Sequence, residues 1–134
     1  MRELSDRWIL PLAGQTVTRC CVDDALNIEL SEAGSSEATI QIIGALDLQL
    51  RGRTWRLDPQ GDAVALAPAL ALVGLTVDHA EAFKDGTLNV AFRDGSSFQV
   101  APDRDYEAWV FAGRTGAKAV SLPGGDIAVW RSAA

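Results

Sequence analysis

Hydrophobic and polar residues alternate with a period of two along much of this chain, which is the pattern of half-buried β-strands. In residues 72–100, the turn signals at 84–86 (KDG) and 93–95 (RDG) separate three short apolar-rich runs. Asp-Gly turns between alternating runs favour β-hairpins. We therefore predict a three-stranded antiparallel meander with one packed face and one solvated face.

A second segment, residues 12–43, shows the same organisation. Its runs at 16–22, 26–30 and 38–42 alternate apolar with polar side chains, and the turn residues Asp23-Asp24 and Gly34-Ser35-Ser36 separate them. These runs predict a second three-stranded meander, which precedes the first one in the chain.

The two meanders share short matching stretches in the same order. LAGQTV at 12–17 corresponds to LVGLTV at 72–77, LNI at 26–28 to LNV at 88–90, and GSS at 34–36 to GSS at 95–97. The near-constant spacing of the matches favours an internal duplication of one unit, covering residues 12–43 and 72–101. The alternative is chance recurrence of residues that are common in strands and turns.

The segment between the meanders predicts a hairpin followed by a short helix. The hairpin runs from Leu46 to Leu57 and turns at Arg51-Gly52. Asp62 is a plausible N-cap, and residues 63–73 are almost wholly apolar. Because proline clashes with the carbonyl four residues back, Pro68 predicts one turn at 63–66 and then a separate short helix. Without a polar face, this helix is expected to be buried against a sheet.

The C-terminal third predicts one more hairpin and a last strand. Residues 106–111 and 118–122 form the hairpin, 123–126 (PGGD) a tight turn, and 127–130 the strand. The whole chain of 134 residues is then expected to be one mainly β domain. Its expected architecture is an antiparallel sandwich or a flattened barrel, built from two duplicated meanders with one short buried helix.

Charge argues against two classes of partner. The chain has 12 basic and 18 acidic residues, so its net charge is −6. An acidic surface repels phosphate backbones and anionic lipid, so we expect no nucleic-acid and no membrane partner. It would suit a basic protein, although acidic surfaces also serve solubility alone.

The sequence also predicts a compartment. Residues 1–14 lack the long apolar core and the cleavage site of a signal peptide, and the apolar run at 63–75 is shorter than a membrane span. We therefore expect a cytoplasmic protein in which Cys20 and Cys21 stay reduced.

No residue pattern predicts catalysis, a metal or a cofactor. His79 is the single histidine, and we expect it on a strand, on the same side as Val77 and Phe83, as a partly buried structural residue. One histidine with two adjacent cysteines matches no zinc spacing. The chain has no phosphate-binding glycine motif and no nucleophile elbow.

Two clusters are candidate binding sites. Three arginines, Arg51, Arg53 and Arg56, lie within six positions and could bind an anion, although solvated hairpin charges are the simpler interpretation. Asp105, Tyr106, Glu107 and Trp109 combine carboxylates with aromatic rings, as protein-binding hot spots do. The alternative is that the aromatic rings close the end of the core while the carboxylates are solvated.

The chain resembles a known family along almost its whole length, residues 12–130. The most specific shared motifs are DPQGD at 58–62, YEAW at 106–109 and PGG at 123–125. They are similar to those of a family of small uncharacterised actinobacterial proteins, catalogued as a domain of unknown function. The resemblance implies an actinobacterial, cytoplasmic, single-domain protein and implies no activity.

Three functions remain open from the sequence. The first is a non-enzymatic interaction module, of an immunity or regulatory type, that masks a basic partner protein. The second is a small-ligand-binding domain or enzyme whose pocket lies between sheet and helix. The third is a homodimer formed through a sheet edge or through the end that carries Trp109 and Trp130.

Overall fold

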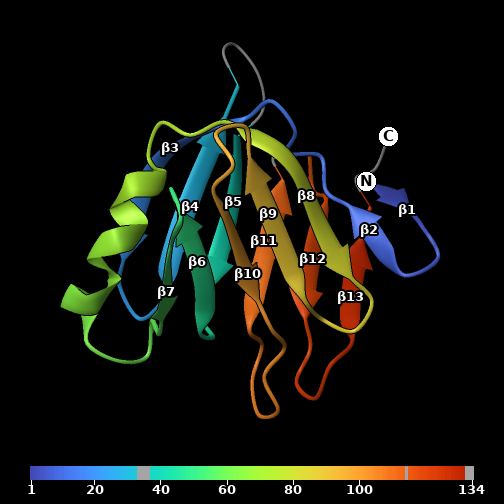
Figure 1. Cartoon of the computed structure of the whole chain (residues 1–134). Helices are drawn as coiled ribbons and strands as arrows, with labels where there is room; N and C mark the ends of the chain where they lie inside the picture. Colours follow the sequence, from blue (N-terminus) through green and yellow to red (C-terminus); the bar gives the residue numbers. More distant parts are fainter. Residues whose placement is uncertain (33–36, 114, 132–134) are drawn as a thin grey trace.

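Two antiparallel sheets pack face to face in the computed structural model, which describes residues 1–32, 37–113 and 115–131 (Figure 1). The predicted mainly β fold is confirmed. Of the two expected architectures, the structure has the sandwich, because both sheets are open and neither closes into a barrel. One short helix, η1 (Ala63–Leu72), lies at one side of the two layers.

The larger sheet has seven strands, which follow one another in the order β1 (Arg2–Glu3), β2 (Arg7–Ile9), β8 (Val77–Phe83), β9 (Leu88–Phe92), β10 (Ser97–Val100), β6 (Leu46–Leu50) and β7 (Arg53–Leu57). The smaller sheet has six strands, in the order β13 (Ile127–Trp130), β12 (Lys118–Ser121), β11 (Trp109–Gly113), β5 (Glu37–Ile42), β4 (Leu26–Ser31) and β3 (Thr16–Val22). The predicted meanders are β3-β4-β5 and β8-β9-β10, one in each sheet. The turn expected at 34–36 lies outside the described residues.

Alternation in the sequence places the core between the sheets. In β4 the side chains of Leu26, Ile28 and Leu30 are buried, and in β9 those of Leu88 and Val90 are completely buried. Each such side chain stabilises the fold by about 1.5–3 kcal/mol through removal from water. The packed inner face predicted for both meanders is therefore confirmed.

The segments 12–17 and 72–77 pair with each other where the two sheets meet. Thr16 and Thr76 form an antiparallel bridge, and their hydroxyl oxygens are 3.1 Å apart. The surrounding backbone bonds occur in matched pairs: Gly14 N donates to Val77 O as Gly74 N donates to Val17 O, and Val17 N donates to Leu75 O as Val77 N donates to Gln15 O. These bonds are related by a local two-fold axis, so the two matching hexapeptides adopt the same backbone arrangement around it.

The symmetry extends into the strands that follow. Each hexapeptide enters a strand that has a register shift just after its valine, between Val17 and Arg19 in β3 and between Val77 and His79 in β8. The strands that follow each meander in the chain join the other meander's sheet: β6 pairs with β10 in the larger sheet, and β11 pairs with β5 in the smaller sheet. The duplication itself stays a prediction, with this symmetric arrangement in its favour.

Helix η1 differs from its prediction in two ways. It is one continuous 3₁₀ helix, so the predicted break before Pro68 is wrong; the tighter turn avoids the clash that an α-helix imposes between proline and the carbonyl four residues back. Only one side is buried, through Leu66, Ala69 and Leu72. Val64 and Leu70 are 79% and 57% exposed, so the helix covers the side of the sandwich and leaves an apolar surface of its own.

Candidate functional site

The segment 105–109 divides between surface and core. Asp105, Tyr106 and Glu107 are exposed, whereas the Trp109 side chain is fully buried. The Trp109 Nε1–H donates to Gly86 O at 2.9 Å, and the Ser121 hydroxyl donates to the same oxygen at 2.8 Å. Trp109 therefore closes the end of the core, which one of the two interpretations expected of both aromatic rings, while Tyr106 faces solvent together with Asp105 and Glu107.

Three loops that are distant in the sequence meet around this segment. The Gln60 side chain donates to Asp24 O at 2.8 Å and to Ile43 O at 3.2 Å, while Ile43 N donates to Ala108 O. Through Ile43, these bonds join loops 23–25 and 58–62 to Ala108, which follows loop 101–107, along the lower edge of the view in Figure 1. We call this surface the acidic end; its carboxylates belong to Asp23, Asp24, Asp58, Asp62, Asp103, Asp105 and Glu107. Arg104 is the single basic residue in the three loops.

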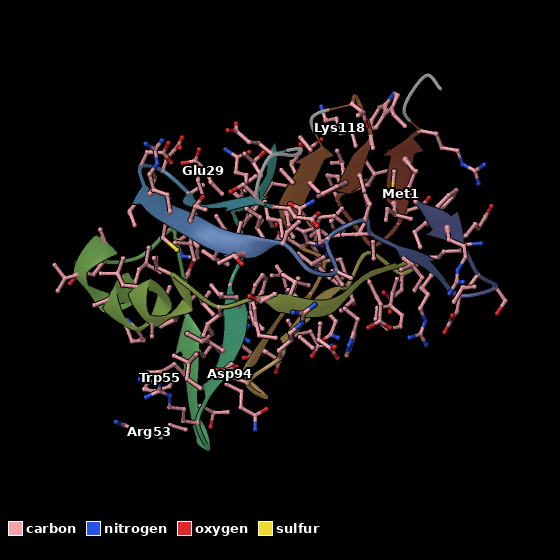
Figure 2. The ribbon with its side chains drawn as sticks, turned by 90° about the horizontal axis from the view of Figure 1, so that it is seen from above. Met1, Glu29, Arg53, Trp55, Asp94 and Lys118 are labelled. Atoms are coloured by element: carbon pink, nitrogen blue, oxygen red, sulfur yellow. The ribbon has the colours of Figure 1, made fainter. Side chains whose placement is uncertain are left out.

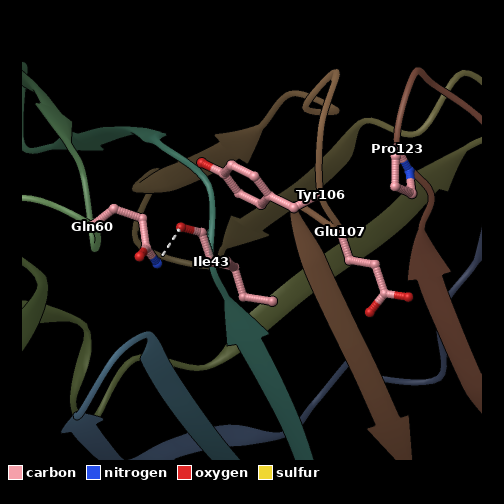
Figure 3. A pocket seen from close by; sticks show the side chains of 5 residues that line it. All are labelled: Ile43, Gln60, Tyr106, Glu107 and Pro123. Atoms are coloured by element: carbon pink, nitrogen blue, oxygen red, sulfur yellow. Dashed lines mark hydrogen bonds between the residues drawn. The ribbon is translucent and has the colours of Figure 1, made fainter.

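A shallow hollow of about 470 Å³ lies in the acidic end, and we call it the Tyr106 hollow. It is lined by Ile43, Gln60, Tyr106, Glu107 and Pro123 (Figure 3). The Tyr106 ring points toward Gln60, and the Glu107 carboxylate extends on the other side of Ile43 (Figure 3). The hollow thus combines an aromatic ring and apolar walls with a carboxylate at its rim.

The negative charge of the acidic end affects the pKa of the Tyr106 phenol. Its pKa is raised above the ordinary value, first because the ring is partly buried and then because the negative charge of Asp103 disfavours the phenolate. Asp58 and Asp105 act in the same direction more weakly. Carboxylates from two separate loops therefore act on one aromatic side chain.

A second apolar surface adjoins the acidic end along η1. A groove of about 250 Å³ lies between the helix and the end of β3, and it is lined entirely by apolar side chains: Val22, Leu26, Ala63, Val64, Leu66, Ala67 and Leu70. Because Val22 precedes Asp23 and Ala63 follows Asp62, carboxylates border the groove at this end. We call it the η1 groove.

The three arginines of the hairpin do not form one site. Alternation along β7 turns Arg56 to the outer face, where Nη1 is 3.0 Å from Asp47 Oδ1. Arg53 lies on the other face, with its guanidinium 4.9 Å from the centre of the Trp55 ring. Arg51 and Arg53 instead line a cavity of about 410 Å³ together with Leu50, Trp55, Ala71, Leu75, Asp94 and Ser96, which we call the Arg51 pocket.

His79 lies on the solvated face of β8, with its side chain 51% exposed. The predicted common side with Val77 is wrong, because the register shift between these residues turns Val77 into the core and His79 outward. Its ring nitrogens are 3.1 Å from Asp78 Oδ2 and 3.4 Å from Glu81 Oε1. These contacts are local to the strand, and His79 lines neither the Tyr106 hollow, the η1 groove nor the Arg51 pocket.

Cys20 and Cys21 are free thiols on β3. Burial raises the pKa of Cys20 to about 11, and its Sγ lies 3.8 Å from Ala69 O in η1. Within the described ranges, no three His, Cys, Asp or Glu side chains are grouped so that they could hold a metal ion. None of the helices in the part of the chain that the structure describes has the length and apolar character needed to cross a membrane.

Sequence reasoning missed both the meeting of the three acidic loops and the exposed side of η1. DPQGD at 58–62 reads as a turn, and only the contacts of Gln60 place it beside Asp24 and Ile43. A purely apolar helix reads as buried, and no local signal distinguishes burial on all sides from burial on one side. Trp130, proposed for a dimer interface together with Trp109, is 51% exposed, whereas Trp109 is inaccessible.

A model described as "Family of unknown function (DUF6188)" matches residues 8–131 of the chain. The match confirms the resemblance to a domain of unknown function, while the actinobacterial origin stays a prediction. No curated protein and no solved structure matches the chain.

Proposed function

Since the chain belongs to the family of unknown function DUF6188, we propose a function from its own surface: a non-enzymatic interaction module that binds a basic protein partner through the acidic end. The observation that carries this proposal is the meeting of seven carboxylates from three loops around two apolar hollows, with Arg104 as the single basic residue among them. Like charges gathered on one surface repel one another, and an oppositely charged partner relieves that repulsion.

The two hollows supply the apolar part of such an interface. Interfaces bury apolar and aromatic groups at their centre and keep charges at the rim. The exposed side chains of Val64 and Leu70 would pack on apolar residues of the partner. The Tyr106 ring would receive a lysine or arginine side chain, whose charge is attracted both to the aromatic face and to the carboxylates around it.

This geometry suits a masking role of an immunity or regulatory type in the cytoplasm. A basic protein whose own function requires its positive surface is blocked when that surface is covered by an acidic end. The same charge disfavours nucleic acid and anionic membranes as partners, because both present negative phosphates. A homodimer formed through the acidic end is disfavoured, since two copies of this surface would repel each other.

The test compares two variants of equal charge. The first neutralises the acidic end through Asp58→Asn, Asp105→Asn and Glu107→Gln. The matched control carries Glu37→Gln, Asp47→Asn and Asp78→Asn, which are exposed carboxylates outside the three loops. Each protein is used to capture partners from the native cytoplasm, and bound proteins are identified by mass spectrometry.

We expect wild type and control to capture the same basic protein, and the acidic-end variant to bind it about tenfold more weakly, since each exposed charge pair contributes a few tenths of a kcal/mol to about 1 kcal/mol. Added salt should weaken the complex, because exposed charges are screened beyond about 10 Å at 0.1 M salt. A partner retained equally by both variants would exclude the acidic end as the contact surface. A doubled mass in solution with η1 protected from exchange would assign the η1 groove to a homodimer instead.

The two halves of the fold are best explained by duplication of one ancestral unit, covering residues 12–43 and 72–101. Support comes from the matched hydrogen bonds of the two hexapeptides and from the matched register shifts after Val17 and Val77. Relatives in which the two halves are more alike than they are in this chain would strengthen this interpretation.

A further inference from the structure

The Arg51 pocket lies apart from the acidic end, at the opposite end of the β6-β7 hairpin. Arg51 is at the tip of the hairpin and Arg53 begins β7, whereas Asp58 follows the last residue of that strand. Five strand residues at about 3.3 Å each separate the two regions by about 16 Å. Seen from above, Arg53, Trp55 and Asp94 lie together on the side of the molecule next to η1 (Figure 2).

The pocket has an apolar interior and a basic rim. Leu50 is 8% exposed, and Trp55 and Leu75 pack against the core from the surface side. The rim carries two positive charges from Arg51 and Arg53 and one negative charge from Asp94. The volume of about 410 Å³ lies within the range of small-molecule sites.

The three charged side chains on the rim differ in whether they already have a partner within the protein. Both oxygens of the Asp94 carboxylate are engaged within its own turn, by Ser96 N at 2.8 Å and by the Ser96 hydroxyl at 3.2 Å. In the part of the chain that the structure describes, no carboxylate forms an ion pair with Arg51 or Arg53. Arg53 rests against the Trp55 ring at 4.9 Å, which holds the guanidinium in one orientation. Two cations, of which Arg53 is oriented by the Trp55 ring, thus remain open to an incoming anion.

The backbone of Arg51 gives an independent indication. Arg51 has φ of +49° and Gly52 has φ of +81°, as a type I′ turn requires at its two central positions. Asn, Asp or Gly is favoured at the first of these positions, and Arg51 is the one non-glycine residue with positive φ among those described. A charged side chain kept on a disfavoured backbone at the mouth of a cavity points to a role outside folding.

From these observations we infer that the Arg51 pocket binds an amphipathic organic anion. The ligand's carboxylate, sulfonate or phosphate group receives hydrogen bonds from Arg51 and Arg53, and its flat or aliphatic body lies against Trp55, Leu50 and Leu75. Guanidinium groups match such anions because their planar N–H groups can bond two oxygens at once. This inference goes beyond the proposed function, because it uses no residue of the acidic end.

The test uses 1-naphthoate as the probe, with two matched controls. Neutral 1-naphthalenemethanol has the apolar body without the charge, and inorganic phosphate has the charge without the body. Amide and indole signals of the ¹⁵N-labelled full chain are followed during each titration, and affinity is measured by calorimetry. We expect naphthoate to shift the Trp55 indole and the amides of Gly52 and Ser96, with much weaker effects from both controls.

Three variants then locate the charge requirement. Arg51→Asn should weaken naphthoate binding by about tenfold to a hundredfold, the usual loss for a hydrogen bond between charged groups. Its melting temperature should equal or exceed that of the wild type, because asparagine is favoured at that turn position. Arg53→Gln should weaken binding similarly, whereas Arg56→Gln, on the outer face, should leave it unchanged.

Several results would overturn the inference. These are an unshifted Trp55 indole at millimolar naphthoate, equal binding of the neutral alcohol or of phosphate alone, and equal losses for Arg56→Gln and Arg51→Asn. If Arg51→Asn fails to fold, Arg53→Gln and Arg56→Gln still decide the outcome. None of these results depends on partner capture, so this inference and the proposed function can fail separately.

Discussion

The Tyr106 hollow in the acidic end and the Arg51 pocket are similar in volume and opposite in charge. Each places one aromatic ring, Tyr106 or Trp55, beside apolar walls in a hollow of a few hundred Å³. Carboxylates act on the first ring, whereas the Arg53 guanidinium lies over the second and Arg51 lines the same pocket. The charged residues lie in turns or at the start of a strand, so the strands of this sandwich provide the scaffold while the loops determine the charge of each end.

The two ends also differ in what lies beneath them. Under the acidic end, Gly86 is enclosed, and its carbonyl accepts hydrogen bonds from Trp109 and Ser121. The corresponding Asp-Gly turn near the Arg51 pocket contains Gly95, and a Cβ added there would meet no atom within 4 Å. The residues around Gly86, beneath the acidic end, are therefore closely packed, whereas the turn beside the Arg51 pocket has open space around Gly95.

The largest expected effect is the difference in stability loss between alanine substitutions at these two glycines. Both have positive φ, +98° for Gly86 and +91° for Gly95. An alanine Cβ at Gly86 would lie 2.9 Å from Pro102 Cβ and 3.2 Å from Asp126 O. We expect Gly86→Ala to lower the free energy of unfolding by about 2–5 kcal/mol, and Gly95→Ala to lower it by about 1–2 kcal/mol through backbone strain alone. Urea denaturation measures both free energies of unfolding. Equal losses for the two variants would show that the residues around Gly86 are not closely packed.

A smaller effect is expected when only the hydrogen bond from the indole is removed. Trp109→Phe keeps an aromatic ring in the core but loses the donor to Gly86 O and part of the packed volume. Because Ser121 still donates to that oxygen, we expect a loss of about 1–3 kcal/mol in the free energy of unfolding. Trp130→Phe is the control, since Trp130 is 51% exposed and should cost little. A cost for Trp109→Phe no larger than that of the control would contradict this account.

The smallest effect is electrostatic and is read from the single tyrosine of the chain. The ultraviolet absorbance of the phenolate should show Tyr106 titrating above the ordinary value of about 10, and Asp103→Asn should lower the pKa toward that value. The raised pKa means that the folded state holds the phenol proton more tightly, so its stabilising contribution is present below pH of about 10 and is lost as pH rises through the folded value. Asp47→Asn is the distant control, and a shift as large as that of Asp103→Asn would show that the effect is not local.

The strands were predictable because their information is local. Alternation and Asp-Gly turns predicted β8, β9 and β10, and alternation with the turn residues at 23–24 and 34–36 predicted β3, β4 and β5. Which strands extend each meander within its sheet was not predictable. This pairing depends on contacts between residues far apart in the chain, such as Val100 and Leu46. At the candidate site, the sequence left open whether Tyr106 and Trp109 form a binding hot spot or close the core, and the structure exposes Tyr106 and buries Trp109. The sequence does not show that the Trp109 indole has an acceptor in Gly86 O.

The pairing of segments 12–17 and 72–77 has a consequence for how the chain can fold. The strands that follow each meander pair with the other meander, β6 with β10 and β11 with β5, so β5 and β10 are fully paired only when both halves of the chain are present. Contacts of such long sequence separation form late and slow the search for the native state. Because the pairing is two-fold symmetric, the same bonds could form between two separate chains. At high concentration, folding within one chain therefore competes with exchange of halves between chains, and dilute refolding should favour the monomer.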